Sequence, residues 1–224
     1  MIEIITATRL SAEEFWQTSA LGQSLKRVSY DNTMLLAAFF ENKHGLSEIY
    51  NECIVSGDAN NLIVFIHDDV WIDDCFFSYR VQEGLKHYDV LGVAGTKRRI
   101  PLQPGWGYMD KEFNIDDRVN LSGLIAQGEQ PLGQLYSFGD VPAECELMDG
   151  VFLAAKKQTL IQNNVFFDPQ FQFHFYDLDF CRTARQQGLR LGTWPICLTH
   201  QSSGAFGEPR WVEQYHRYIK KWGD

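Results

Sequence analysis

The sequence has no long apolar run, no internal repeat and no low-complexity tract. No window approaches the roughly 18 apolar residues that a membrane-spanning helix requires, which argues against a membrane span. The first residues, MIEII, lack the basic region and the apolar core of a signal peptide. The 224 residues contain no linker and suit one well-filled domain. We therefore expect a single domain in the cytoplasm, with peripheral membrane association left open and the oligomeric state undetermined.

Basic residues are scarce as well. The chain has 20 Lys and Arg against 29 Asp and Glu, a formal net charge of −9 at pH 7. Nucleic-acid binding needs a basic face, so this composition argues against it. A nucleotide remains possible, because a metal ion can neutralise a diphosphate locally. The five cysteines form no CxxC pair, and most lie in apolar or helical segments, so we expect buried free thiols.

What the sequence does have is an alternation of apolar and helical segments. Strand, helix and strand follow one another in its first half, which predicts a parallel sheet with right-handed crossovers. The signal is weak over 97–144, where we expect a functional insertion with short antiparallel strands. The last helix carries a stripe of aromatic residues that indicates docking onto the core. The expected strands are 2–7, 34–40, 62–66, 90–94, 146–155 and one within 190–199. The expected helices are one that begins near residue 11, and 46–55, 73–87, 156–163, 178–187 and 208–222.

The segment 61–72 carries the strongest functional signal. Its apolar run, 62–66, suits a strand buried on both faces, and it stops abruptly at His67, Asp68 and Asp69. Two carboxylates at the end of a buried strand are costly unless a cation lies there. Ligands bind at that end of parallel strands, and oxygen ligands suit Mg²⁺ or Mn²⁺. The alternative is a solvated turn in which Asp68 caps the segment that follows.

Polar residues follow other apolar runs in the same way. If these runs are strands of one sheet, several of the polar groups meet at its carboxyl edge. They are Thr6 to Arg9, Glu41, Asp149 with Gly150, Asp177 with Asp179, and His200.

Four motifs in order resemble glycosyltransferase family 2, which has the glycosyltransferase A fold. Residues 45–51, GLSEIYN, followed by 63–69, IVFIHDD, resemble its nucleotide-sugar half, in which an Asp-x-Asp motif ends an apolar strand. Residues 148–151, MDGV, resemble the acceptor-side strand; residues 176–179, YDLD, resemble its Glu-Asp-x-Asp segment, and 199–204, THQSSG, its closing His segment. The resemblance spans about residues 1–205. His67 and Tyr176 stand where the family has acids, and the usual Pro-x-x-Asn after the first strand is absent.

The resemblance implies an α/β Rossmann-like, mostly parallel sheet flanked by helices, with a small antiparallel sheet on the acceptor side. Residues 1–96 would form the nucleotide-sugar half and 97–224 the acceptor and catalytic half. The implied activity is inverting, metal-dependent transfer from a nucleoside-diphosphate sugar, with a UDP-sugar favoured and Mn²⁺ or Mg²⁺ as the cofactor. The implied acceptor is a glycan or a lipid-linked acceptor, in surface polysaccharide or glycan synthesis.

Site residues follow from the same comparison. Asp69 and His200 are expected to hold the metal, although His200 could be a structural histidine and His67 could be the imidazole ligand in its place. Asp177 is the candidate general base, with helix capping as its alternative role. If Asp177 caps the helix, Asp179 points elsewhere and could pair with Arg182 or Arg185 on the surface. We expect the substrates to be bound by Thr6, Ala7, Thr8, Arg9, Glu41, Asp68, Asp149, Gly150, Trp106 and Tyr176; Tyr108 and Trp194, like Trp106, could stack on sugar faces.

Other classes of protein compete with this interpretation. A sugar nucleotidyltransferase also uses carboxylates and Mg²⁺, but no Gly-rich loop with Arg or Lys follows the first strand. Because His67 replaces an acid, a sugar-binding module without turnover is a second alternative. A glycoside hydrolase needs two carboxylates across a cleft, which the sequence does not exclude, but it has no use for a metal motif.

Overall fold

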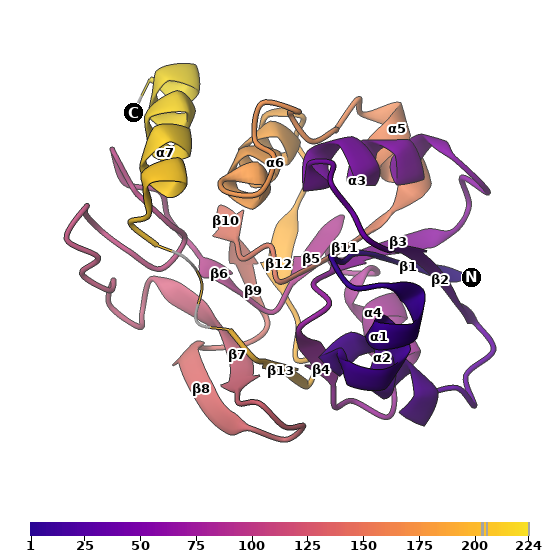
Figure 1. Cartoon of the computed structure of the whole chain (residues 1–224). Coiled ribbons are helices and arrows are strands. Elements are labelled where there is room, and N and C mark those ends of the chain that lie inside the picture. The colour runs from indigo at the N-terminus through magenta and orange to yellow at the C-terminus, as the bar shows by residue number, and fades with distance from the viewer. Residues whose placement is uncertain (203, 205, 224) are drawn as a thin grey trace.

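The computed structural model describes residues 1–202, 204 and 206–223, folded around two sheets (Figure 1). The larger sheet has the strand order β2-β1-β3-β11-β5-β12-β9, and all of its strands except β11 and β9 run in the same direction. This confirms the predicted mostly parallel α/β fold. Its strands are β1 (Ile2–Ala7), β2 (Met34–Phe39), β3 (Leu62–Ile66), β5 (Val90–Gly92), β9 (Ala143–Cys145), β11 (Phe152–Lys156) and β12 (Leu191–Thr193).

The smaller sheet is mostly antiparallel, and only β7 and β13 pair in parallel. Its order is β10-β6-β7-β13-β4, and β8 pairs with β7. The two halves of the chain are interleaved, since β11, β12 and β9 of the second half belong to the larger sheet. The strands of the smaller sheet are β4 (Val70–Ile72), β6 (Ala94–Thr96), β7 (Leu121–Gln127), β8 (Gln134–Gly139), β10 (Leu147–Met148) and β13 (Leu198–His200).

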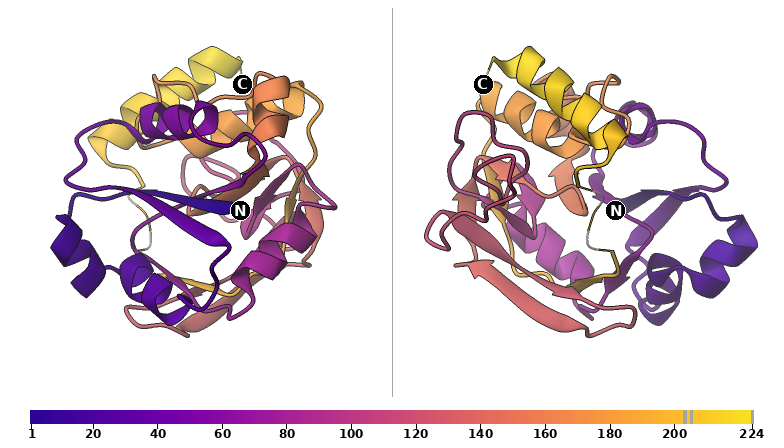
Figure 2. Two further views of the ribbon diagram at one scale, coloured as in Figure 1. Left: turned by 90° about the vertical axis from the view of Figure 1, so that its right-hand side faces the viewer. Right: turned by 60° about the vertical axis from the view of Figure 1, so that its left-hand side comes forward.

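Helices cover the larger sheet on both faces (Figures 1 and 2). β3 shows why: Ile63 and Phe65 belong to one apolar core, and Val64 and Ile66 to the other. The first core is closed by α3, α5, α6 and α7, and the second by α1, α2 and α4. The helices are α1 (Ala12–Thr18), α2 (Ala20–Arg27), α3 (Leu46–Val55), α4 (Phe77–Gly84), α5 (Lys157–Gln162), α6 (Tyr176–Gln186) and α7 (Pro209–Trp222).

Several predicted elements differ in extent from those observed. The segment 34–40 was expected to be a buried strand, but β2 lies at the edge of its sheet and is only partly buried. The apolar run 90–94 breaks at Val93, so that β5 and β6 join different sheets. Helix α4 is shorter than predicted. Of the cysteines, all free, Cys75 and Cys197 are exposed and the other three are buried.

Two features near the carboxyl end concern helices α6 and α7. Helix α6 begins at Tyr176, two residues earlier than predicted, after Phe175 in a left-handed conformation with φ of 62°. Helix α7 packs Trp211 and Tyr218 into the core, which confirms the predicted docking of the aromatic stripe. Among the described residues, no helix is long and apolar enough to cross a membrane.

A buried ion pair ties α5 to the first strand. The side chain of Lys157 is fully buried, and its Nζ lies 2.8 Å from Oε2 of Glu3. Replacing Lys157 with methionine should lower the free energy of unfolding by about 3 kcal/mol, because the Glu3 carboxylate then stays largely buried without its partner. Urea denaturation measures this, with Lys156→Met as the control at an exposed neighbour. Equal urea midpoints for the two variants would contradict the prediction.

Candidate active site

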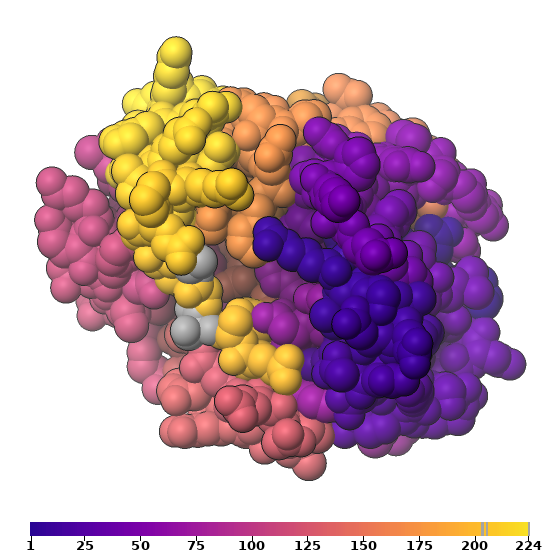
Figure 3. Space-filling view, in the orientation of Figure 1, coloured from indigo at the N-terminus to yellow at the C-terminus, as the bar shows by residue number. Residues whose placement is uncertain are grey.

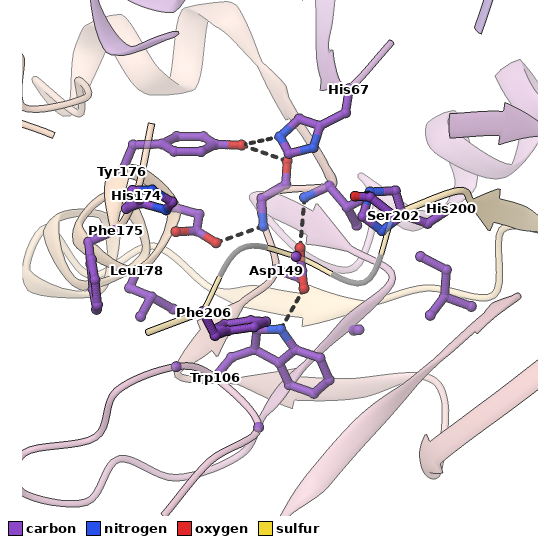
Figure 4. Close-up of a pocket in the computed structure, with 18 of the residues that line it drawn as sticks. His67, Trp106, Asp149, His174, Phe175, Tyr176, Leu178, His200, Ser202 and Phe206 are labelled. Atoms are coloured by element: carbon purple, nitrogen blue, oxygen red, sulfur yellow. Dashed lines mark hydrogen bonds between the residues drawn. The ribbon is translucent and has the colours of Figure 1, made fainter. Parts of the chain in front are cut away.

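Four segments of the chain meet at one cavity of about 600 Å³. The turn after β3, the loop between β10 and β11, the start of α6 and the end of β13 each contribute polar side chains to its wall (Figure 4). On the surface, the described residues that directly follow β13 lie between the amino-terminal part of the chain and the region of β8 (Figure 3). The residues that the four segments bring together are His67, Asp68, Asp69, Asp149, Tyr176, Asp177 and His200.

Strand pairing explains why these segments meet. β3 and β11 are antiparallel, with Ile66 opposite Phe152, so the residues after Ile66 lie beside those before Phe152. The backbone N–H of His67 accordingly donates to the carbonyl of Val151 at 3.3 Å. Where β13 pairs with β4, His200 lies opposite Val70, which places it next to Asp69.

His67, Asp69 and His200 form a cluster suited to a metal ion. One ligand atom from each lies within 4.8 Å of the others, and Oδ2 of Asp69 is 3.3 Å from Nε2 of His200. The other oxygen of Asp69, Oδ1, is buried without a hydrogen-bond partner among the described residues. A carboxylate oxygen left in this way beside two imidazoles fits a divalent cation. The structure thus brings the two expected ligands together and places His67, the alternative imidazole ligand, beside them.

Charge and burial set the ionisation of the cluster. Burial disfavours the charged forms of all three groups. For Asp69 the hydrogen bond and charge of His200 outweigh burial and lower the pKa to about 2. For His200 the Asp69 carboxylate outweighs burial and raises the pKa, whereas burial prevails at His67 and lowers its pKa. The cluster therefore favours an ionised carboxylate next to a neutral His67.

Asp177 lies in the first turn of α6 and not at its cap, so the capping alternative is wrong. Its Oδ2 accepts a hydrogen bond from the backbone N–H of Gly150 at 2.9 Å. Burial, and then the negative charge of Asp149, raise the pKa of Asp177 to about 7. A carboxylate with such a pKa can take up a proton near neutral pH, as a general base must.

Asp149 is held by two donors. Nε1 of Trp106 donates to its Oδ2 at 2.6 Å, and the backbone N–H of Val151 donates to its Oδ1 at 2.8 Å (Figure 4). Trp106 belongs to the segment 97–120, which is fastened by Arg98, whose Nε lies 2.8 Å from Oδ2 of Asp116. The segment 97–144, where the sequence signal is weak, therefore forms one wall of the cavity.

The residues expected to bind the donor are distributed unevenly. Ala7 and Asp68 line the cavity. The loops after β1 and β2 lie side by side, since the N–H of Asn42 donates to the carbonyl of Thr8 at 2.8 Å. Trp194 stacks on His87 and is absent from the cavity wall, whereas Tyr108 is part of it. Four other expected donor residues lie outside the described wall: Thr6 and Thr8, which are buried, and Arg9 and Glu41, which are exposed.

Asp179 does not form the predicted surface pair with Arg182 or Arg185. Its side chain is fully buried, with Oδ1 2.6 Å from Nζ of Lys221 and 2.9 Å from Nε1 of Trp222. Arg185 instead contacts Glu144 and Glu146. The prediction is wrong because helix α7 covers this side of α6. Ser203, in the closing motif 199–204, lies outside the described residues.

Comparison with solved structures identifies the fold as the glycosyltransferase A type. GalNAc-T7 solved with UDP, GalNAc and Mn²⁺ matches with a TM-score of 0.56 and 11% sequence identity, over 98% of this chain and 48% of that chain. S. aureus TarS matches with a TM-score of 0.48 and 14% identity, over 97% of this chain and 38% of that chain. The catalytic domain of Drosophila beta1,4-galactosyltransferase 7 with xylobiose matches with a TM-score of 0.49 and 14% identity, over 96% of this chain and 79% of that chain. This chain thus spans less than half the length of the first and second of these proteins.

The family follows from the sequence comparison. The glycosyltransferase-like family matches residues 29–220, which is most of the chain, so the protein belongs to that family. A comparison with curated protein sequences gave no match. The resemblance that the motifs indicated is therefore confirmed at the level of the family and of the fold.

Proposed function

We propose that this protein is an inverting, metal-dependent glycosyltransferase that uses a nucleoside-diphosphate sugar, with a UDP-sugar favoured. The observation that carries the proposal is the position of the His67, Asp69 and His200 cluster and of Asp177 on the wall of one cavity. The neighbour GalNAc-T7, solved with UDP and Mn²⁺, supports the choice of donor and of cation. Residues 1–96 would then serve mainly the donor and 97–224 mainly the acceptor.

The roles of the side chains follow from this arrangement. A divalent cation held by Asp69 and His200, Mn²⁺ or Mg²⁺, would stabilise the charge of the departing diphosphate. Asp177 takes the proton of the acceptor hydroxyl as its oxygen attacks the anomeric carbon. The bond between that carbon and the diphosphate oxygen breaks, and its electron pair leaves with the diphosphate. One displacement from the opposite face inverts the anomeric centre.

The composition of the cavity wall bears on the acceptor. Aromatic rings gather on it, and the described lining residues include neither Lys nor Arg. Sugars stack their apolar faces on such rings, whereas an anionic acceptor would find no lysine or arginine among these lining residues. Asp149, held by Trp106, offers a carboxylate to hydroxyl groups. We therefore favour a carbohydrate hydroxyl, on a glycan or on the sugar of a lipid-linked acceptor, as in surface polysaccharide or glycan synthesis. The aromatic rings include those of Trp106, Tyr108, Phe138, Phe173, Phe206 and Trp211.

Release of UDP from a panel of UDP-sugars, with and without Mn²⁺, tests the proposal. A glycosyltransferase should liberate UDP slowly by hydrolysis and faster with an acceptor. A sugar-binding module, which His67 in place of an acid would favour, should liberate none. It would still be stabilised by about 2.7 kcal/mol at a ligand concentration of 100 times Kd. Stabilisation without UDP release from any sugar would overturn the proposed turnover.

Gly150 leaves no room for a side chain. A Cβ at this position would collide with Oη of Tyr176 and would lie 2.8 Å from Cβ of Asp177. Gly150→Ala should therefore displace both side chains and reduce kcat about 100-fold, as misplacements near 1 Å can. The control is Gly107→Ala, where a Cβ meets nothing within 4 Å. Steady-state UDP release measures the effect, and equal kcat for the two variants would contradict it.

A further inference from the structure

The hydroxyl of Tyr176 joins two groups of the site. It donates to the carbonyl of Gly150 at 2.9 Å, and it lies 2.8 Å from Nε2 of His67 (Figure 4). A carbonyl oxygen only accepts hydrogen bonds, so the single proton of Tyr176 is committed to Gly150. Nε2 of His67 must then donate to the phenol oxygen. The proton of the neutral imidazole is therefore on Nε2.

This tautomer leaves the lone pair of Nδ1 free. The ring is fixed further by Phe173, which stacks on it with centroids 6.3 Å apart and planes 19° from parallel. Tyr176 lies on one side of the His67 ring and His200 on the other (Figure 4). Ligand atoms of His67, Asp69 and His200 lie within 4.8 Å of one another, close enough for a single ion to bind all three.

We propose that His67 binds the cation through Nδ1, beside Asp69 and His200, and that Tyr176 is the positioning residue that fixes its tautomer. The site then consists of two imidazoles and one carboxylate, and it selects a first-row transition metal over Mg²⁺. This inference rests on the proposed function, which leaves the choice between Mn²⁺ and Mg²⁺ open.

The ligand set explains the selectivity. Mg²⁺ prefers oxygen ligands in a strict octahedron and loses its water reluctantly, whereas imidazole suits later first-row metals. A histidine in place of a carboxylate also removes one negative charge, and this loss weakens the binding of a hard ion such as Mg²⁺ the most. Affinity at such a site rises from Mn²⁺ to Co²⁺ along the first row. The aromatic contact and the hydrogen bond on the second nitrogen are the outer partners that orient a histidine ligand.

Electron paramagnetic resonance of Mn²⁺ tests the inference, because protein-bound Mn²⁺ loses the sharp signal of the free ion. The titration is run on the full chain, first without nucleotide and then with UDP. In the wild type, Co²⁺ should displace Mn²⁺ at equal concentration, and Mg²⁺ should fail to do so at 100-fold excess. Tyr176→Phe should weaken Mn²⁺ binding about 10-fold, as is usual when a residue that orients a metal ligand is lost. His67→Ala removes a ligand and should weaken Mn²⁺ binding about 10-fold or more.

Matched variants separate positioning from packing. Tyr218→Phe removes the hydroxyl of another buried tyrosine, outside the cavity wall, and should leave Mn²⁺ affinity unchanged. His67→Asp restores an acid and should let Mg²⁺ displace Mn²⁺. Thermal melting of each variant without metal shows whether it is folded.

Four results would overturn the inference. Wild-type Mn²⁺ affinity in His67→Ala would remove His67 from the ligands, and the same result in Tyr176→Phe would remove its positioning role. Displacement of Mn²⁺ by Mg²⁺ at up to 100-fold excess in the wild type would remove the selectivity. No binding of Mn²⁺ with or without UDP would remove the metal site itself. Intact, selective Mn²⁺ binding without UDP release from any UDP-sugar would overturn only the proposed function.

Discussion

Asp69→Ala should abolish metal-dependent binding of UDP and leave the protein folded. The variant removes the one carboxylate of the cluster, including the buried Oδ1 that has no partner among the described residues. A metal–diphosphate contact is worth several kcal/mol, and each 1.4 kcal/mol is a tenfold change, so Kd should rise about 100-fold or more. Calorimetric titration of UDP with Mn²⁺ measures the loss.

The stability of the same variant separates a local effect from unfolding. The pKa of Asp69 is lowered to about 2, so its contact with His200 outweighs the cost of burial. The metal-free variant should therefore remain folded but melt a few degrees below the wild type. Asp140→Ala is the matched control, since this exposed carboxylate is not part of the cavity wall. Unchanged UDP affinity in Asp69→Ala would move the metal site elsewhere in the chain.

Asp177→Asn should reduce kcat about 1000-fold, within the range typical of general acid–base catalysis. Asparagine is isosteric and keeps an oxygen that can accept the hydrogen bond from Gly150, so the geometry of the turn is retained. UDP binding with Mn²⁺ should persist, because Asp177 is not one of the three residues of the metal cluster.

The pH dependence of the reaction tests the role of Asp177 more directly. A general base acts in its ionised form, and the pKa of this carboxyl is raised to about 7. Wild-type kcat should therefore fall as the pH drops through about 7 and level off above it. The residual activity of Asp177→Asn should lack this step. If the variant retained the step, another group would be the base.

The fold was largely predictable where the apolar pattern is continuous. The run 62–66 gave the bounds of β3, because a strand buried on both faces needs no polar alternation. The run 90–94 was equally apolar, yet the chain leaves one sheet and enters the other at Val93. A pattern of hydrophobic residues indicates that a segment is buried, but it does not indicate which sheet the segment joins. The length of α6 was missed because Phe175, before it, adopts a conformation that its residue type disfavours.

The site was predictable only where a motif marked it. Asp69 and His200 were paired from their positions in the resemblance, and the structure places them in contact. The contact between His67 and Tyr176 joins residues 109 positions apart, and neither residue matches the acid that the family has there. The two departures are visible in the sequence, but that they touch is a property of the strand pairing. The hydrogen bond from Trp106 to Asp149 had no sequence signal, since it comes from a loop.

Phe175, the left-handed residue before α6, connects helix α7 near the carboxyl end of the chain to the candidate active site. Phe175 packs against Trp211, Tyr215 and Tyr218 of α7, with ring centroids 5.1, 5.9 and 5.3 Å apart. A non-glycine residue in this conformation costs about 1 kcal/mol or more and persists only where its surroundings hold it. The aromatic face of α7 thus holds Phe175 in this conformation, which keeps the side chains of Tyr176 and Asp177 directed at the cavity. Loosening the last helix would let that backbone relax, and catalytic alignment would be lost before the sheet is disturbed.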